Sequence, residues 1–276
     1  MISKNDMRAF KEKSRVLLQT GEYLCLSPHP SLNAYISNYN ITFPTRDIIP
    51  RGFTVMPCGC STLTVTNDGR DLLVNVDGPT IKPYVWDQSS QPEMTVDIEF
   101  KPAGLYAMTG IHQSDLAGKT LPFEAINAAF SRLIAEAVEK SGSVSELAAI
   151  LDALFLANSR AEYRPELPPL IRDICARGGN ISVTRLANNA CFSERQLNRI
   201  FKQFVGIRAK SFSRLIRINH TFRLLKKKHK SLAFISDVSG FHDLAHFAHD
   251  FKQICGVTPQ KYRDTMSDFY NNPTRF

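Results

Sequence analysis

The sequence lacks several features that would assign it to common classes of protein. Its 276 residues contain no apolar run of about 18 residues, the length that spans a membrane as a helix. Residues 1–23, MISKNDMRAFKEKSRVLLQTGEY, are basic but have no apolar core of the kind found in secretory signals. The six cysteines are scattered rather than spaced as a disulfide framework. We therefore predict a soluble, cytoplasmic protein with reduced thiols and no membrane partner.

Metal ligands are scarce in the first half of the chain. Residues 1–163 contain two histidines, His29 and His112, which are far apart in the sequence. A metal enzyme of the β-barrel type needs a cluster of His and Glu on neighbouring strands. We therefore predict that the protein is not an enzyme and has no cofactor.

Two other groups of residues could bind a metal. His242, His246 and His249 have a spacing that places them along one helix, which suits either a zinc site or ordinary packing. Cys58 and Cys60 are closer together than the cysteines of a usual zinc knuckle, so they are either a redox or metal-sensing pair or plain buried thiols. We predict packing and buried thiols, and no metal site.

Charge is distributed unevenly along the chain. Residues 164–264 carry 19 Lys and Arg against 7 Asp and Glu, whereas residues 1–163 carry 14 against 18. A basic segment of about a hundred residues indicates a polyanionic partner, usually nucleic acid. A solvated basic face would have the same composition, so charge alone leaves both interpretations open.

A polar, proline-containing segment separates the two halves. LANSRAEYRPELPPLIRD, at 156–173, carries Pro165, Pro168 and Pro169. Proline fixes its own backbone and has no amide hydrogen, so we predict a linker here. The predicted organisation is an N-terminal domain at 1–160, a linker at 161–169, a second domain at 170–264 and a tail at 265–276.

The basic half contains one pattern twice. FKQFVG at 201–206 returns as FKQICG at 251–256, and each follows a short helical pattern and a turn. In the first copy we predict a helix over 183–190 and a second over 194–205, which Ser193 caps together with Gln196 and which Gly206 ends. In the second copy we predict helices over 231–238 and 243–254, the latter capped by Asp243 and ended by Gly256. Each copy is a helix-turn-helix, in which the second helix reads the DNA major groove.

A further amphipathic helix is predicted between the copies, over 208–230. About twenty residues at about 1.5 Å each give a strut of about 30 Å, and one turn of B-DNA is about 34 Å. The spacing therefore predicts that one chain places two reading helices in two successive major grooves.

These motifs resemble the DNA-binding domain of the AraC/XylS family of bacterial transcription regulators. The resemblance covers residues 170–264, about a third of the chain, and its most specific mark is the closing Gly256-x-Thr258-Pro259-x-x-Tyr262-Arg263. The sequence departs from the family at Ser236, where Ala is usual, and at His249, where Arg is common. The resemblance implies a regulator, mostly of the activating kind, whose partners are double-stranded promoter DNA, RNA polymerase, a small-molecule effector and a second copy of itself. Neither the effector nor the target genes can be predicted.

On the first reading helix, inward-facing Leu197, Ile200 and Phe201 leave four polar residues on the other side. The resemblance implies base contacts at Arg195, Asn198 and Arg199, which suits the two-bond pairing of Arg with guanine and Asn with adenine. Phosphate contact alone is the other interpretation. The predicted phosphate contacts on both motifs are Ser193, Lys202, Lys210 and Lys252.

The second reading helix has weaker chemistry. The positions fifty residues after Arg195, Asn198 and Arg199 hold Ala245, Ala248 and His249. Alanine can touch a thymine methyl group but cannot hydrogen-bond to a base, so His249 is its only polar candidate for a base contact.

The first half resembles, less closely, the effector or dimerisation domain of the same regulators. The resemblance rests on SPHPSLNAYISNYNITF, MPCGCSTLTVT and IEFKPAGLYAMTGIHQSDLAGKTLPFEAI. Short β-branched runs, such as STLTVT and MTVDIEF, predict a small cupin-like β-barrel followed by helices over 122–140 and 143–159. The fold class is thus α+β, with an all-α second domain.

The helices either pair two subunits or pack on their own barrel; the dimerisation candidates are Leu133, Ile134, Leu147, Ile150, Leu151 and Leu154. A ligand-independent or thiol/metal-sensing DNA-binding protein is the alternative function.

Overall fold

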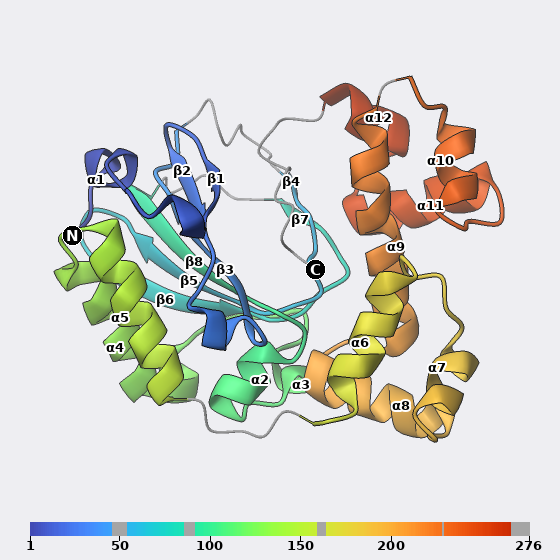
Figure 1. Cartoon of the computed structure of the whole chain (residues 1–276), viewed down its shortest axis with the longest axis horizontal. Coiled ribbons are helices and arrows are strands. Elements are labelled where there is room, and N and C mark those ends of the chain that lie inside the picture. Colours follow the sequence, from blue (N-terminus) through green and yellow to red (C-terminus); the bar gives the residue numbers. More distant parts are fainter. Residues whose placement is uncertain (46–53, 86–91, 159–163, 228, 266–276) are drawn as a thin grey trace.

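A seven-stranded antiparallel sheet forms the N-terminal half, and a bundle of short helices lies beside it (Figure 1). The structure is a computed structural model, and it describes residues 1–45, 54–85, 92–158, 164–227 and 229–265. No helix in these ranges is both long enough and apolar enough to cross a membrane. Residues 266–276 of the predicted tail, Lys228 and residues 161–163 of the predicted linker lie outside the described residues.

The sheet has the strand order β1-β2-β3-β8-β5-β6-β9, and a separate two-stranded ribbon pairs β4 with β7. The strands are β1 Val16–Gln19, β2 Tyr23–Leu26, β3 Ile36–Thr42, β4 Thr54–Val55, β5 Thr62–Asn67, β6 Leu72–Asp77, β7 Tyr84–Val85, β8 Met94–Phe100 and β9 Thr120–Pro122. Within the described residues β1 and β9 are the two edges and do not pair, so the cupin-like closed barrel is not confirmed. Strands β4 and β7 pair with each other instead of extending the sheet.

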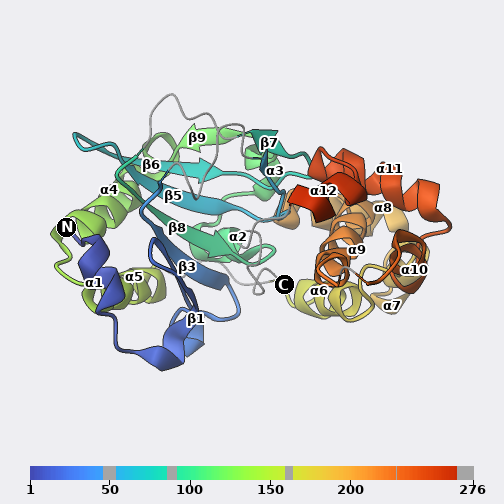
Figure 2. The same ribbon diagram turned by 90° about the horizontal axis from the view of Figure 1, so that it is seen from above.

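The two faces of the sheet differ in chemistry because paired residues of antiparallel strands point to the same side. Tyr39 pairs with Ile98 and Ile41 with Val96, and this face is part of the apolar core. The next register positions put Asn38 opposite Glu99, so the other face is polar. Helices α4 (Glu124–Lys140) and α5 (Val144–Ala157) cover the apolar face, as Figures 1 and 2 show. The remaining short helices of this half are α1 Lys4–Arg8, η1 Lys13–Arg15, η2 Pro30–Leu32, α2 Gly104–Thr109 and α3 Gln113–Leu116.

A buried carboxylate fixes α5 to the sheet. Asp152 accepts hydrogen bonds from the Tyr39 hydroxyl and the His29 amide, both at 2.9 Å, and pairs with Arg15 at 2.9 Å. Burial, together with the nearby Asp152 charge, raises the pKa of the Tyr39 hydroxyl well above its usual value. A buried charge is tolerated only when it is paired and hydrogen-bonded in this way.

Helices α4 and α5 confirm the two helices expected here, with ends within two residues of the predicted ones. Asn127 interrupts α4 with non-helical angles, and its side-chain oxygen accepts from the Phe130 amide. Of the six dimerisation candidates, Ile134, Leu147 and Leu151 are buried in the core of their own domain. Packing on the sheet thus explains these three, and a second subunit could not reach them here. Leu133 is 43% exposed, while Ile150 and Leu154 are half-buried.

The helical half contains the predicted repeat. Its helices are α6 Leu167–Ala176, α7 Val183–Asn189, α8 Glu194–Ile200, η3 Phe201–Val205, α9 Ala209–Leu225, α10 Leu232–Val238, α11 Leu244–Cys255 and α12 Pro259–Thr265. Helices α7 and α8 form the first helix-turn-helix, and α10 and α11 form the second. Gly206 and Gly256 end the two reading helices with φ of 86° and 76°, the left-handed conformation that glycine adopts without strain.

Helix α9 joins the two motifs because it contributes to two separate apolar cores. Phe212 and Ile216 pack with α6, α7 and α8, whereas Leu215 and Ile218 pack with α10 and α11. Figure 1 shows α9 running between the two motifs. The helix ends at Leu225, five residues before the predicted end, where apolar residues give way to a lysine-rich run whose like charges repel.

Two other expectations need correction. Pro168 and Pro169 are not in a linker: they lie in the first turn of α6, where the missing amide hydrogen has no helical partner to lose. The first reading helix is α-helical only to Ile200 and continues as a π-helix over Phe201–Val205.

Ser236 bonds forward along the chain and not back to the preceding turn as would be usual within a helix. Its hydroxyl donates to the backbone oxygen of Asp243 at 2.9 Å. The hydroxyl therefore ties α10 to the cap of α11, and this bond satisfies a buried polar group at the position where the family has Ala.

The two turns differ at one equivalent residue. Cys191 has φ 55° and Gly240 has φ 70°, and each is followed by a phenylalanine whose amide donates to the preceding helix. A non-glycine residue in this region is strained by about 1–2 kcal/mol. The first motif therefore carries strain that the second avoids.

We expect Cys191→Gly to raise the free energy of unfolding by up to about 1 kcal/mol, because relief of strain exceeds the added flexibility of the unfolded chain. Urea unfolding of the full chain measures the change. The control is Gly240→Ala, whose added carbon would meet the Asn180 side chain and should destabilise. Lower stability in Cys191→Gly would contradict the assignment of strain.

Candidate nucleic-acid interface

The first reading helix presents a basic side to solvent. Its N-terminal cap is Ser193, whose hydroxyl accepts from the Gln196 amide at 3.2 Å; this confirms the cap but not the return bond expected from the Gln196 side chain. Leu197, Ile200, Phe201 and Phe204 are buried, which confirms the inward face. Arg195, Arg199 and Lys202 are exposed on the opposite side. Three cations on one accessible helix face can contact both base edges and phosphates.

Asn198 is less available than the sequence suggested. Its amide nitrogen donates to the backbone oxygen of Glu194 at 3.0 Å. Its side-chain oxygen is buried, and within the described ranges it has no hydrogen-bond partner. The side chain would have to rotate away from its own helix before it could pair with adenine.

The far end of this helix contacts the N-terminal domain. Phe204 packs edge-on against Tyr106 of α2, with ring centroids 4.7 Å apart, and Arg164 lies over the same ring. The Gln203 side-chain nitrogen lies 3.3 Å from the ring nitrogens of His112, which precedes α3. Gly206 lies against Pro79. The first reading helix is therefore held at one end by the sheet domain.

The second reading helix is capped by Asp243, whose carboxylate accepts from the His246 amide at 2.7 Å. That bond and a second one from the His242 ring lower the pKa of the carboxyl. Ala245, His249 and Lys252 are exposed on the outer side. Leu244, the first residue of the helix, is 44% exposed, and the sequence pattern did not single it out.

A buried carboxylate orients α11 on α9. Asp250 is 5% exposed and receives two hydrogen bonds from Arg214, at 3.1 and 2.8 Å. Arg214 also donates to Gln253 at 2.7 Å. A two-bond guanidinium–carboxylate pair fixes direction as well as distance, so it sets the angle of α11 on the strut.

The three histidines face carboxylates and aromatic rings. His242 lies 3.1 Å from Asp243, while His246 and His249 lie 3.5 and 3.7 Å from Asp250. The His246 ring also packs edge-on against Phe241. No group of three potential metal ligands comes together in the described part of the chain.

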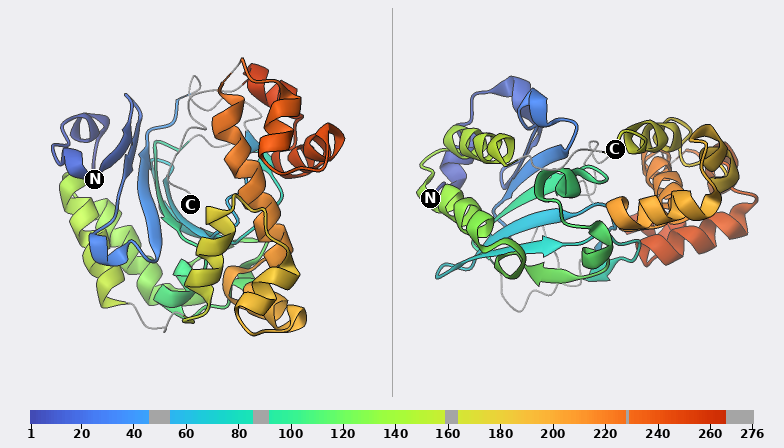
Figure 3. Two further views of the ribbon diagram at one scale, coloured as in Figure 1. Left: turned by 45° about the vertical axis from the view of Figure 1, so that its right-hand side comes forward. Right: turned by 90° about the horizontal axis from the view of Figure 1, so that it is seen from below.

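The two reading helices run in similar directions, and both end toward the sheet domain, as Figures 1 and 3 show. Lys202 and Lys252, the predicted phosphate contacts on α8–η3 and α11, are exposed, and so is Lys210 near the start of α9. The structure thus brings Arg195, Arg199 and Lys202 onto one helix face and His249 and Lys252 onto another.

A family model described as a helix-turn-helix domain matches residues 186–265. The probable transcription factor PqrA of Proteus vulgaris is 33% identical over 94 residues, which are 33% of this chain and 77% of that protein. The chain belongs to the AraC family of transcription regulators. Its helical half matches a helix-turn-helix domain, and the relatives named here are transcription regulators, which agrees with the prediction that the chain is not an enzyme.

Another relative covers more of this chain. The arabinose operon regulatory protein of Escherichia coli K12 is 27% identical over 182 residues, which are 61% of this chain and 60% of that protein. The chain thus spans less than two thirds of that relative. Among solved structures, an AraC-type regulator from Chromobacterium violaceum is 26% identical and covers 38% of this chain and 96% of its own, with a TM-score of 0.34. ToxT of Vibrio cholerae is 12% identical and covers 78% of this chain and 94% of its own, with a TM-score of 0.45.

The cysteine pair of this AraC-family chain has the properties of structural thiols. Cys58 is half-buried and Cys60 is buried. A hydrogen bond with Cys58 and burial raise the pKa of the Cys60 thiol well above its usual value. The thiolate is the reactive form of cysteine, so this environment disfavours reactivity at Cys60.

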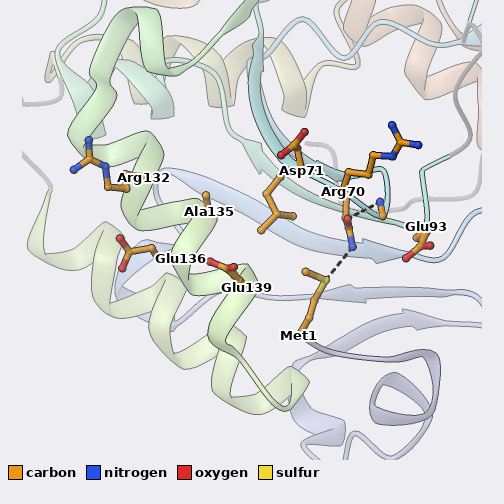
Figure 4. A pocket seen from close by; sticks show the side chains of 11 residues that line it. Met1, Arg70, Asp71, Glu93, Arg132, Ala135, Glu136 and Glu139 are labelled. Carbon is orange, nitrogen blue, oxygen red and sulfur yellow. Dashed lines mark hydrogen bonds between the residues drawn. The ribbon is translucent and has the colours of Figure 1, made fainter.

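A surface pocket of about 550 Å³ lies between α4 and the β5–β6 hairpin (Figure 4). Its charged lining residues are Arg70, Asp71, Glu93, Arg132, Glu136 and Glu139. Small-molecule sites are mostly apolar with a few polar groups, and this lining is the reverse. The pocket therefore does not identify an effector site.

We expect Arg214→Ala to lower the free energy of unfolding by about 2–3 kcal/mol, because it leaves Asp250 buried without its guanidinium. DNA binding should weaken as α11 loses its orientation. Arg223→Ala is the matched control: Arg223 is exposed on the same helix, and the change should stay within about 0.5 kcal/mol. Thermal and urea unfolding of both variants measure the difference, and equal losses would contradict the role of the Arg214–Asp250 pair.

Proposed function

We propose that this chain regulates transcription by placing α8–η3 and α11 in two successive major grooves of promoter DNA. The observation that carries the proposal is the repeated motif: two capped, glycine-ended reading helices are mounted on separate cores along one helix, α9. The 17 residues of α9 span about 25 Å, which is of the order of one turn of B-DNA. A dimeric repressor achieves this with two subunits, and here a single chain would suffice.

The proposed roles follow from side-chain chemistry. Arg195 and Arg199 pair with guanine, and Asn198 pairs with adenine after it leaves its own helix. His249 is the polar group of the second helix. The proposed phosphate contacts are Ser193, Lys202, Lys210 and Lys252, which position the domain without selecting a sequence.

Arg199→Ala should weaken binding to the cognate site by about 1–3 kcal/mol and relax the preference at one base position. His249→Ala should weaken all sequences by a smaller and similar amount. Selection from randomised DNA with the wild type and both variants measures the two effects. The expected pattern is one sharp half-site about one helical turn from a vaguer one. Two equally sharp half-sites, or loss of a base preference in His249→Ala, would refute these roles.

We also propose that the N-terminal domain senses a small effector. Two observations support this. The polar sheet face carries a hydrogen-bonded network in which Asn40 accepts from Tyr23 at 2.7 Å and donates to Glu99 at 3.0 Å. The same domain contacts the first reading helix through Tyr106 and Phe204, which gives a direct route from the domain to DNA. An effector bound there would act on α8, and the activated regulator would then recruit RNA polymerase as an activator.

Dimerisation is proposed through Leu133, the exposed candidate on α4. Leu133→Asp should shift the full chain from dimer to monomer in sedimentation velocity, since burying an unpaired carboxylate at an interface is unfavourable.

In the same samples, polar metabolites that bind the domain should raise its melting temperature. A monomeric wild type would refute dimerisation, and stability unchanged by a broad panel of polar metabolites would argue against an effector.

A further inference from the structure

Apolar surface lies where the second reading helix begins. Leu244 is 44% exposed, Ala245 is exposed and Ala248 is half-buried. Leu244 does not belong to the apolar core under α11, which contains Phe247, Phe251 and Ile254. The leucine therefore contributes little to packing.

The internal repeat supplies a comparison within the same chain. Fifty residues earlier, the positions of Leu244, Ala245 and Ala248 hold Glu194, Arg195 and Asn198. The caps, Ser193 and Asp243, and the terminal glycines correspond between the copies. Three polar groups on one reading helix are thus replaced by three apolar groups on the other, on the same kind of scaffold.

The charges around this apolar surface suit DNA. His242, His249 and Lys252 are exposed beside it. Of the two carboxylates on or next to α11, Asp243 caps the helix and Asp250 is buried beneath Arg214. An apolar tip with Lys252 and two imidazole rings beside it matches a major groove, where phosphates flank the base edges.

We propose that α11 reads the 5-methyl groups of thymine, with Leu244 as the main contact and Ala245 and Ala248 as lesser ones. The thymine methyl is the apolar group that the four base pairs present in the major groove. This inference rests on the proposed function, because it requires α11 to enter that groove. It assigns to the second half-site a preference for thymine at fixed positions, where His249 is the one hydrogen-bonding candidate for a base contact among the exposed residues of α11 described above.

The test replaces thymine by uracil, which removes the methyl group and leaves base pairing intact. The duplex is a site recovered by in vitro selection with the full chain, and thymines are replaced first in one half-site and then in the other. Fluorescence anisotropy gives the dissociation constant of each duplex. Uracil in the α11 half-site should weaken binding about fourfold for each contacted methyl group, and uracil in the Arg195 half-site should change it less than twofold.

Two variants assign the effect to its residue. Leu244→Ala should reduce the uracil penalty in the α11 half-site to less than twofold, because the side chain that contacts the methyl is gone. Leu156→Ala is the matched control: Leu156 is a leucine on α5 with 45% exposure, and the full fourfold penalty should remain. Leu244 is exposed, so its truncation should not unfold the domain.

The outcomes separate this inference from the proposed function. A footprint of the full chain on the selected site adds a second measurement. If it shows two protected half-sites but uracil carries no penalty, recognition of the methyl group is overturned and two-groove binding is left intact. A footprint with a single half-site would overturn the proposed function itself. A Leu244→Ala variant that keeps the full uracil penalty would overturn the assignment of the methyl contact to Leu244.

Discussion

The two-sided burial of α9 is the constraint on which the helical half depends. Residues separated by one position face different cores: Phe212 and Ile216 pack with the first motif, and Leu215 and Ile218 pack with the second. An ordinary surface helix buries one stripe, and α9 buries two. The relative placement of the two reading helices therefore depends on the sides of α9 from which these apolar residues project. The Arg214–Asp250 pair also fixes the orientation of α11 on α9.

The sheet domain reaches both motifs. Ala103 and Tyr106 join the core of the first, while Met56 joins the core of the second. Leu215 of α9 also lies against Gly59, so close that a side chain at Gly59 would collide with it. The π-helical turn at Phe201–Val205 occurs where α8 meets this domain, and such turns are frequent at functional sites. Because the sheet domain contacts both cores, a change in its structure would alter the spacing of the two motifs as well as the position of α8.

Sequence reasoning succeeded where structure is local. Ser193, Asp243 and the glycines at 206 and 256 specify helix ends through neighbouring backbone groups, and the structure has those ends. It failed where contacts between segments far apart in the sequence determine strand pairing or side-chain exposure. Which strands β4 and β7 choose as partners depends on the whole sheet, so closure could not be read from short alternating runs. The exposure of Leu244 and the inward turn of Asn198 depend on packing around the helix, and Pro168 was misassigned because proline marks helix starts as readily as linkers.

The separate cores of the two motifs have a consequence for how such a regulator changes over time. Among the described residues, the exposed side chains of α8 and α11 belong to neither apolar core, so substitutions on one reading face leave the apolar packing under the other unchanged. Effects at distant sites without shared partners usually add. Under the proposed two-groove binding, one half of the operator could drift to a new sequence while the other keeps the regulator on its promoter, so specificity could change one half-site at a time.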